Sequence, residues 1–252
     1  MSIPHIIHYC WFGRNPKPEL IQKCIQSWEK YMPDWKIIEW NEDNFDVRMS
    51  AYSSEAYEYK KWAFVSDYAR FWIIAKYGGI YFDTDVELLK EIPDNILDCH
   101  AFMASESAGS VNPGLVYGSI PNHYFSKKML EKYNLEHFLI NGKPVIITVN
   151  ERTTRELVSL GFIKTDDIQT VDDIVIYPKD YFCGFDLDVR EYDIKPITIS
   201  VHHYANSWGK ISLKRRCQNF IKKIIGVNNY RRCLMIKRKY LGIAGERRDT
   251  NL

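Results

Sequence analysis

Apolar positions in the first part of the chain form short strand-like runs that alternate with helical periodicity. Residues 3–12, 35–40 and 80–82 are apolar runs bounded by Gly, Pro or polar residues, which indicates buried strands. Apolar side chains fall on one face over Glu19 to Tyr31, which predicts an amphipathic helix. A longer helix is predicted from Ser54 to Tyr77, ended by two glycines.

The same alternation continues to about residue 204. Further strands are predicted at residues 86–89, around Ala101 and Leu115, and at 173–178 and 197–204, with helices at 122–138 and 151–160. Strands that alternate with helices predict an α/β fold in layers around a mainly parallel sheet.

Charge is distributed unevenly along the 252 residues, although the net charge is only +2. From Gly209 onward the chain has 13 Lys or Arg and two acidic residues, a balance of +11. The remaining 21 basic and 30 acidic residues lie before it, a balance of −9. An acidic body and a basic tail indicate two different roles.

The basic tail has helical apolar periodicity from Leu213 to Val227, followed by a second basic segment from Tyr230 to Leu241. We therefore predict a domain at residues 1–210 and a basic amphipathic helical tail at 211–252. The tail either packs on the body or binds an anionic membrane surface, and we favour the membrane. No nucleic-acid partner is expected, because the body is acidic and shows no nucleic-acid-binding motif.

Targeting signals do not stand out in the sequence. The amino-terminal residues lack a basic region followed by a long apolar run, and no stretch reaches the roughly 20 apolar residues of a membrane span. The six cysteines include no CxxC pair, which suggests reduced thiols. We expect a cytoplasmic protein, peripheral at the inner face of the membrane.

Candidate chemistry lies in the segment KYGGIYFDTDVEL, residues 76–88, where Asp83 and Asp85 follow the strand at 80–82. In open α/β sheets, ligands bind beyond the carboxyl ends of the strands. Two adjacent carboxylates repel each other unless a cation relieves them, and a hard divalent ion suits them. The alternative is a loop with two solvated acids.

Two further segments provide groups for the same site. Asp67 and Arg70 share a helical face, either as a simple ion pair or as the wall of a polar pocket that holds sugar hydroxyls. His202 and His203 follow a late strand, and one of them can reach the site, since adjacent strand residues face opposite sides. We choose His202, although a lone histidine is more often a core residue.

Four sequence blocks together resemble bacterial members of glycosyltransferase family 32, which transfer sugars and contain a DxD motif. The blocks are IPHIIHYCWFG, WKIIEWNEDNF, KKWAFVSDYARFWIIAKYGGIYFDTDVELL and VHHYANSW, in this order from residue 3 to residue 208. The resemblance implies a GT-A fold, which is a Rossmann-like nucleotide-sugar-binding layer. It also implies Mn²⁺ or Mg²⁺ and transfer of a hexose or N-acetylhexosamine with retention of configuration.

The resemblance also assigns roles to particular residues. Asp67, Arg70, Asp83 and Asp85 would be catalytic, and the metal would be held by Asp83, Asp85 and His202. The donor nucleotide and sugar would contact His8, Tyr9, Trp11, Phe12, Gly13, Asp67, Arg70, Tyr81, Asp83, Ser207 and Trp208. UDP-galactose, UDP-N-acetylhexosamine, UDP-glucose and GDP-mannose all stay open as donors, with UDP-sugars favoured. The expected acceptor is a glycan of a capsule or another surface polysaccharide, and a lipid-linked glycan is one form of it.

Two rival functions fit parts of the sequence. A haloacid dehalogenase-type phosphohydrolase also has apolar residues followed by DxD, but its motif opens the domain, whereas here three predicted elements come first. Its later acidic pair should follow a strand, yet Asp172 and Asp173 precede one. A non-catalytic sugar-binding module would not need the DxD together with Asp67 and Arg70. A transferase is therefore the favoured prediction.

Overall fold

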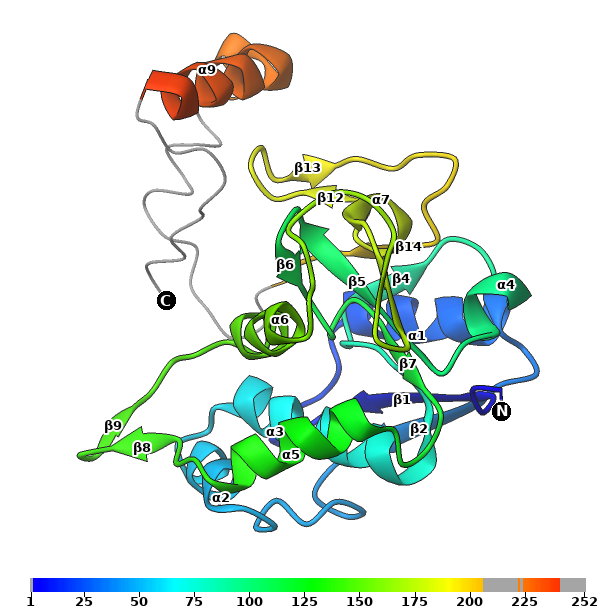
Figure 1. Ribbon diagram of the computed structural model, residues 1–252, viewed down its shortest axis with the longest axis vertical. Coiled ribbons are helices and arrows are strands. Elements are labelled where there is room, and N and C mark those ends of the chain that lie inside the picture. Colours follow the sequence, from blue (N-terminus) through cyan, green and yellow to red (C-terminus); the bar gives the residue numbers. More distant parts are fainter. Residues whose placement is uncertain (1, 206–221, 223, 241–252) are drawn as a thin grey trace. The chain divides into compact units, whose positions relative to one another are not determined.

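The computed structural model describes residues 2–205, 222 and 224–240, and its centre is a sheet in the strand order β10-β11-β5-β7-β3-β1-β2, with β6 beside β5 (Figure 1). The strands are β1 (Ile6–Cys10), β2 (Lys36–Trp40), β3 (Gly79–Tyr81), β5 (Ala101–Ser107), β6 (Ser110–Val111), β7 (Tyr117–Ser119), β10 (Gln169–Val171) and β11 (Ile174–Tyr177). The expected α/β fold class is confirmed.

The sheet is mixed, which corrects the expectation of a mainly parallel one. Strands β2, β1, β3, β5 and β11 run in one direction, but β7 and β10 run in the other. β7 lies between β3 and β5 and pairs antiparallel with both, so it separates the two parallel groups. The five strands that share a direction still end at one edge, where ligands bind in such folds.

Helices cover both faces of this sheet. Successive residues of β1 point to opposite faces: Tyr9 packs against Trp28 of α1 (Glu19–Tyr31), and His8 packs against Tyr77 of α3 (Trp62–Tyr77). The bounds predicted for α1 are confirmed. The main apolar core lies on the α3 side, where Phe71 packs against Tyr117 of β7 and Phe125 of α5 (Tyr124–Asn134).

The single long helix predicted from Ser54 to Tyr77 is wrong. The chain forms α2 (Ala51–Glu58) and then α3, because Lys60 has a φ of 55° and ends α2. The amide of Lys61 donates to the Ala56 carbonyl and that of Lys60 to the Tyr57 carbonyl, which is a Schellman motif. Glycine usually occupies the left-handed position of this motif, so a lysine there gave no signal in the sequence.

Other predicted elements differ mainly at their ends. Helix α5 starts at Tyr124, two residues late, because Asn122 has a φ of 62° and His123 caps the helix. Helix α6 (Val149–Ser159) starts two residues early, because Thr148 accepts a hydrogen bond from the Glu151 amide. The remaining elements are β4 (Val86–Leu88), α4 (Asp94–Leu97), β8 (Leu139–Ile140), β9 (Lys143–Pro144), α7 (Lys179–Phe182), β12 (Phe185–Asp186), β13 (Glu191–Tyr192), β14 (Ser200–His202) and α9 (Val227–Tyr240).

The chain separates into two compact units. One consists of Met1–Gly184 and Ile194–His203 and contains the sheet. The other consists of Phe185–Asp193 and Tyr204–Leu252, and its described parts are residues 185–193, 204–205, 222 and 224–240, which include the β12–β13 hairpin and α9. The predicted domain boundary at residue 210 and most of the helix predicted at 213–227 lie outside the described residues. Among those that are described, no helix is long and apolar enough to cross a membrane.

Candidate active site

Asp83 and Asp85 lie where β3 reaches the edge shared by the strand ends, as the sequence predicts. The Asp83 amide donates to the Gly114 carbonyl at 2.9 Å, which draws the loop before β7 against the DxD. A Cβ on Gly114 would lie 1.9 Å from Asp83 Oδ2, so no larger residue fits there without moving the carboxylate. Asp83 keeps 30% of its side chain exposed and is therefore accessible to a ligand.

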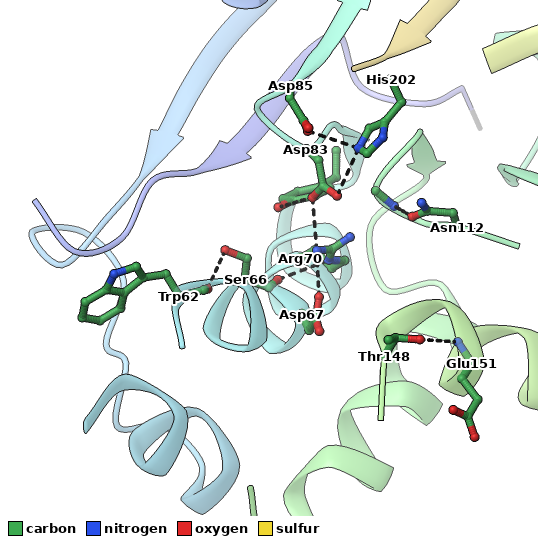
Figure 2. Close-up of polar contacts among 12 residues, drawn as sticks. Trp62, Ser66, Asp67, Arg70, Asp83, Asp85, Asn112, Thr148, Glu151 and His202 are labelled. Carbon is green, nitrogen blue, oxygen red and sulfur yellow. Dashed lines mark hydrogen bonds and ion pairs between the residues drawn. The ribbon is translucent and has the colours of Figure 1, made fainter. Parts of the chain in front are cut away.

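Arg70 links the two acidic segments. Its Nη2 donates to Asp67 Oδ1 at 2.9 Å and lies 3.1 Å from Asp83 Oδ1, and its guanidinium stacks over the ring of Tyr81 at 4.8 Å (Figure 2). Arg70 Nη1 is buried and has no hydrogen-bond partner among the described residues. Asp67 and Arg70 thus form more than a local ion pair, because the arginine extends to the DxD and retains an unused donor.

Burial and charge shift the pKa values of this cluster. Burial raises the pKa of the Asp67 carboxyl to about 7, against the opposing effect of Arg70. Burial disfavours the charged form of Arg70, but Asp83, Tyr81 and Asp67 outweigh it and raise the pKa of the guanidinium. The Tyr81 hydroxyl donates to Asp83 Oδ1 at 3.3 Å, and burial raises its pKa well above the ordinary value. The phenol is therefore neutral and the arginine charged at neutral pH.

His202 reaches the DxD through a strand pair. β14 pairs antiparallel with β4 and sets His202 opposite Val86, next to the aspartates. Its Nε2 lies 3.1 Å from Asp85 Oδ1 and 4.0 Å from Asp83 Oδ2. His203 turns away, with Nε2 2.9 Å from Glu87 Oε2. The structure therefore brings the chosen histidine to the aspartates.

The aspartates favour positive charge at His202. Burial disfavours protonation of the imidazole, but Asp85 and Asp83 outweigh this effect and raise its pKa. The carboxylates of Asp83 and Asp85 therefore favour a cation beside them, either as a proton on His202 or as a metal ion. As the side chains stand, no group of three or more His, Cys, Asp and Glu among the described residues is arranged to hold a metal ion.

The first two residues predicted to contact the nucleotide are engaged within the protein. His8 is fully buried, with Nε2 3.0 Å from the Gly78 carbonyl and Nδ1 accepting from Trp40 Nε1 at 3.1 Å. The Tyr9 hydroxyl donates to Glu39 at 2.7 Å. For His8, this geometry favours a structural role at the glycine pair over the predicted contact with the nucleotide.

The next three predicted residues continue β1 to the same edge as the DxD. Trp11 and Phe12 are nearly buried, and the Gly13 amide donates to Glu42 Oε1 at 2.7 Å. Gly13 has a φ of 92°, and a Cβ there would lie 2.6 Å from the indole of Trp62. The sequence reasoning missed Trp62, because the predicted long helix placed it mid-helix, whereas it begins α3 beside Gly13.

The last predicted donor residues, the loop residue Asn112 and the acidic residue Asp173 lie in different places. Ser207 and Trp208 lie outside the described residues. Asn112 is buried, accepts from the Gly114 amide at 2.7 Å and donates to Glu106 at 3.0 Å, so it shapes the loop that contacts Asp83. Asp173 directly precedes β11 and lies 3.0 Å from both His100 and His123, at the opposite edge of the sheet. It therefore cannot act with the DxD as the phosphohydrolase alternative requires.

Comparison with known proteins finds a sequence match to one protein family and a weaker structural likeness. Residues 18–103 match the family described as "Glycosyltransferase sugar-binding region containing DXD motif". This segment contains Asp67, Arg70, Tyr81, Asp83 and Asp85, and it excludes β1 and β14. A solved glycosyltransferase involved in glycosylation of the major capsid of PBCV-1 superposes with a TM-score of 0.49 at 12% identity, over 87% of this chain and all of the other.

Several characterised relatives share part of the chain. It is 28% identical to inositol phosphoceramide mannosyltransferase 1 of Schizosaccharomyces pombe over 54% of this chain and 46% of the relative. It is 31% identical to human alpha-1,4-N-acetylglucosaminyltransferase over 46% of this chain and 31% of the relative. The chain thus spans less than half of these relatives. The likeness to a DXD-containing glycosyltransferase sugar-binding region thus covers residues 18–103, the part of the chain that contains the two aspartates.

Proposed function

We propose that the protein is a metal-dependent, retaining glycosyltransferase. It would transfer a hexose or N-acetylhexosamine from a nucleotide sugar to a glycan acceptor, in the synthesis of a surface polysaccharide. The observation that carries the proposal is Arg70, buried between Asp67 and Asp83 with one N–H group unpartnered among the described residues. A buried cation with a spare donor, held between these two carboxylates, fits a phosphorylated sugar better than a structural ion pair.

The side chains at the DxD suit a divalent ion. Carboxylate oxygens are the preferred ligands of Mg²⁺ and Mn²⁺, and imidazole is a common ligand of transition metals. Asp83, Asp85 and His202 would hold the ion. Mg²⁺ in phosphate sites is usually bound by one or two carboxylates together with substrate phosphates, so a complete protein cage is not needed beforehand. When bound, such an ion supplies positive charge that stabilises a diphosphate leaving group.

The protein's own residues would act on the donor as follows. Arg70 would donate its spare N–H to a phosphate or sugar oxygen and stabilise the negative charge of the departing diphosphate. Asp67 would accept from sugar hydroxyls and fix the sugar ring. Tyr81 holds Asp83 in place through its hydroxyl at 3.3 Å. The sugar would pass through an oxocarbenium-like state, as in other glycosyl transfers.

Retention of configuration requires the acceptor to attack from the face that the diphosphate leaves. We favour a front-face mechanism in which the leaving phosphate helps to remove the acceptor proton. The expected result is a product with the donor's anomeric configuration, seen by NMR, and no covalent sugar on the protein by mass spectrometry. A trapped adduct on a carboxylate would overturn the front-face step and leave the transferase activity intact.

Relatives guide the choice of substrates to test. The names of the matched relatives specify mannosyl transfer to inositol phosphoceramide and transfer of N-acetylglucosamine. We therefore propose donors that include GDP-mannose and UDP-N-acetylglucosamine, with UDP-sugars favoured, and we include lipid-linked glycans among the acceptors.

A thermal-shift panel of nucleotide sugars with and without Mn²⁺ tests the proposal. A ligand that binds only the folded state raises the melting temperature with concentration. We expect a donor whose shift depends on Mn²⁺, loss of that dependence in Asp85→Asn, and no change in the exposed control Asp166→Asn. If the protein is an enzyme, it should also release free sugar slowly from that donor when no acceptor is present. Binding without any sugar release or transfer would support the non-catalytic alternative.

A further inference from the structure

The second unit holds its helix through ion pairs to a short hairpin. Arg231 Nη2 of α9 lies 3.3 Å from Asp186 Oδ2 of β12. Lys222 Nζ, just before α9, donates to Glu191 of β13 at 2.7 Å and to the Val189 carbonyl at 2.9 Å. Gly226 has a φ of 79°; its amide donates to the Lys222 carbonyl, and its carbonyl accepts from the Tyr230 amide at the start of α9. These contacts commit one side of α9 to the hairpin.

The other side of α9 exposes large apolar side chains. Met235 is 57% exposed and Ile236 49%, and Arg232, three and four residues earlier, is exposed on the same face. Ile224, before Gly226, is 66% exposed. The opposite face of the helix is less exposed and carries Val227, Tyr230 and Leu234. Among the described side chains, the outer face of the helix therefore carries Met235 and Ile236 next to the basic Arg232.

The charge of this segment has a single sign. Helix α9 has five basic residues and no acidic one: Arg231, Arg232, Lys237, Arg238 and Lys239. The whole stretch from Gly209 onward has a balance of +11. A protein partner could cover an apolar strip alone, but exposed apolar side chains among basic residues are typical of helices that lie in the interface of anionic membranes.

We propose that α9 docks on an anionic lipid surface. Met235 and Ile236 would enter the boundary between headgroups and acyl chains, and Arg232 would contact the headgroups. Arg231 and Lys222 would instead hold the helix on its hairpin. A peripheral position at the cytoplasmic face of a membrane follows, because anionic lipids concentrate there. This inference does not depend on the chemistry at the DxD.

Sedimentation of the full-length protein with lipid vesicles tests the proposal. One set consists of phosphatidylcholine and the other of phosphatidylcholine mixed with phosphatidylglycerol. We expect binding to the anionic set alone, weakening as salt rises. The double variant Met235→Glu/Ile236→Glu should reduce the partition coefficient about tenfold or more. Arg232→Glu should reduce it about 25-fold, since each unit of charge contributes roughly fivefold and the change removes one positive charge and adds one negative charge.

Matched controls lie in the first unit. Ile163 is 65% exposed and Arg155 has 67% of its side chain exposed, so Ile163→Glu and Arg155→Glu make the same changes elsewhere. These controls should bind vesicles like the unmodified protein, and all variants should keep its melting temperature and its donor-dependent thermal shift. The proposal would be overturned by equal binding to neutral and anionic vesicles, or by a double variant that binds as well as the unmodified protein. It would also be overturned if the unmodified protein pelleted without vesicles and the double variant did not. The last outcome would indicate self-association.

Discussion

At the scale of single residues, the DxD is defined as much by its neighbours as by its two carboxylates. Arg70 balances Asp83 from one side, His202 approaches Asp85 from another, and Gly114 leaves room for the Asp83 carboxylate. The first two neighbours carry charge, and their residue types could be picked out in the sequence. Gly114 acts through the absence of a side chain, so only the structure shows how closely it approaches.

Gly114→Ala should impair the reaction without unfolding the protein. The new Cβ would lie 1.9 Å from Asp83 Oδ2, so the carboxylate has to move, and misplacement by about 1 Å costs up to 100-fold in rate. We expect kcat/KM for sugar release or transfer to fall about 10- to 100-fold, with a nearly unchanged melting temperature. Gly142→Ala is a control for backbone strain without a clash: nothing lies within 4 Å of its added Cβ, but its φ of 73° disfavours alanine, so it should lower stability and leave kcat/KM unchanged. Wild-type activity in Gly114→Ala would show that the Asp83 position is not critical.

His8 should make stability depend on pH. Burial lowers the pKa of this histidine from 6.5 to about 4, so as the pH falls the unfolded chain takes up the proton before the folded one. The contribution of neutral His8 to the free energy of unfolding is complete above pH 6.5. It is lost as the pH falls toward about 4, a change on the order of 3 kcal/mol. Urea unfolding across this range should show a steeper loss in the unmodified protein than in His8→Asn. Parallel pH profiles would contradict the assignment.

At the scale of elements, periodicity predicted the helix at Glu19–Tyr31 with its observed bounds and the strands that carry the DxD. It failed where one residue adopts an unusual conformation. Lys60 and Asn122 both have positive φ: Lys60 divides one predicted helix into two, and Asn122 delays the start of another. The sequence also could not show that β7 inserts antiparallel between β3 and β5, because strand order depends on packing among distant segments.

Lys60→Gly should stabilise the turn between α2 and α3. Lys60 occupies the left-handed position of the Schellman motif at a φ of 55°, where a Cβ is unfavourable and glycine is not. We expect the free energy of unfolding in urea to rise by about 0.5–1 kcal/mol. Lys61→Gly, at a φ of −97°, should lower it, because glycine there only adds freedom to the unfolded chain. A loss of stability in both variants would argue against the motif.

At the scale of the whole molecule, the site joins segments that are far apart in sequence. Asp67 and Asp83 come from α3 and the end of β3, Gly114 from the loop before β7, and His202 from β14. The sequence motifs predicted which residues take part, because each segment carries its own signal. Their meeting point depends on the β4–β14 pair, which has no local signature. Whether His202 or His203 reaches the aspartates therefore depends on the register of this strand pair, which only the structure shows.

That long-range pairing can be measured as an energetic coupling between Asp85 and His202. If both side chains hold one ion, Asp85→Asn alone should remove most of the Mn²⁺-dependent thermal shift. His202→Ala alone should also weaken Mn²⁺ binding strongly. When it is added to Asp85→Asn, however, the free energy of Mn²⁺ binding should change by less than about 0.5 kcal/mol further. His203→Ala is the matched control, because its ring lies 2.9 Å from Glu87 instead, and its effect should add to that of Asp85→Asn. Full additivity for His202 would mean that the two residues do not share an ion, and the metal set would then reduce to the aspartates.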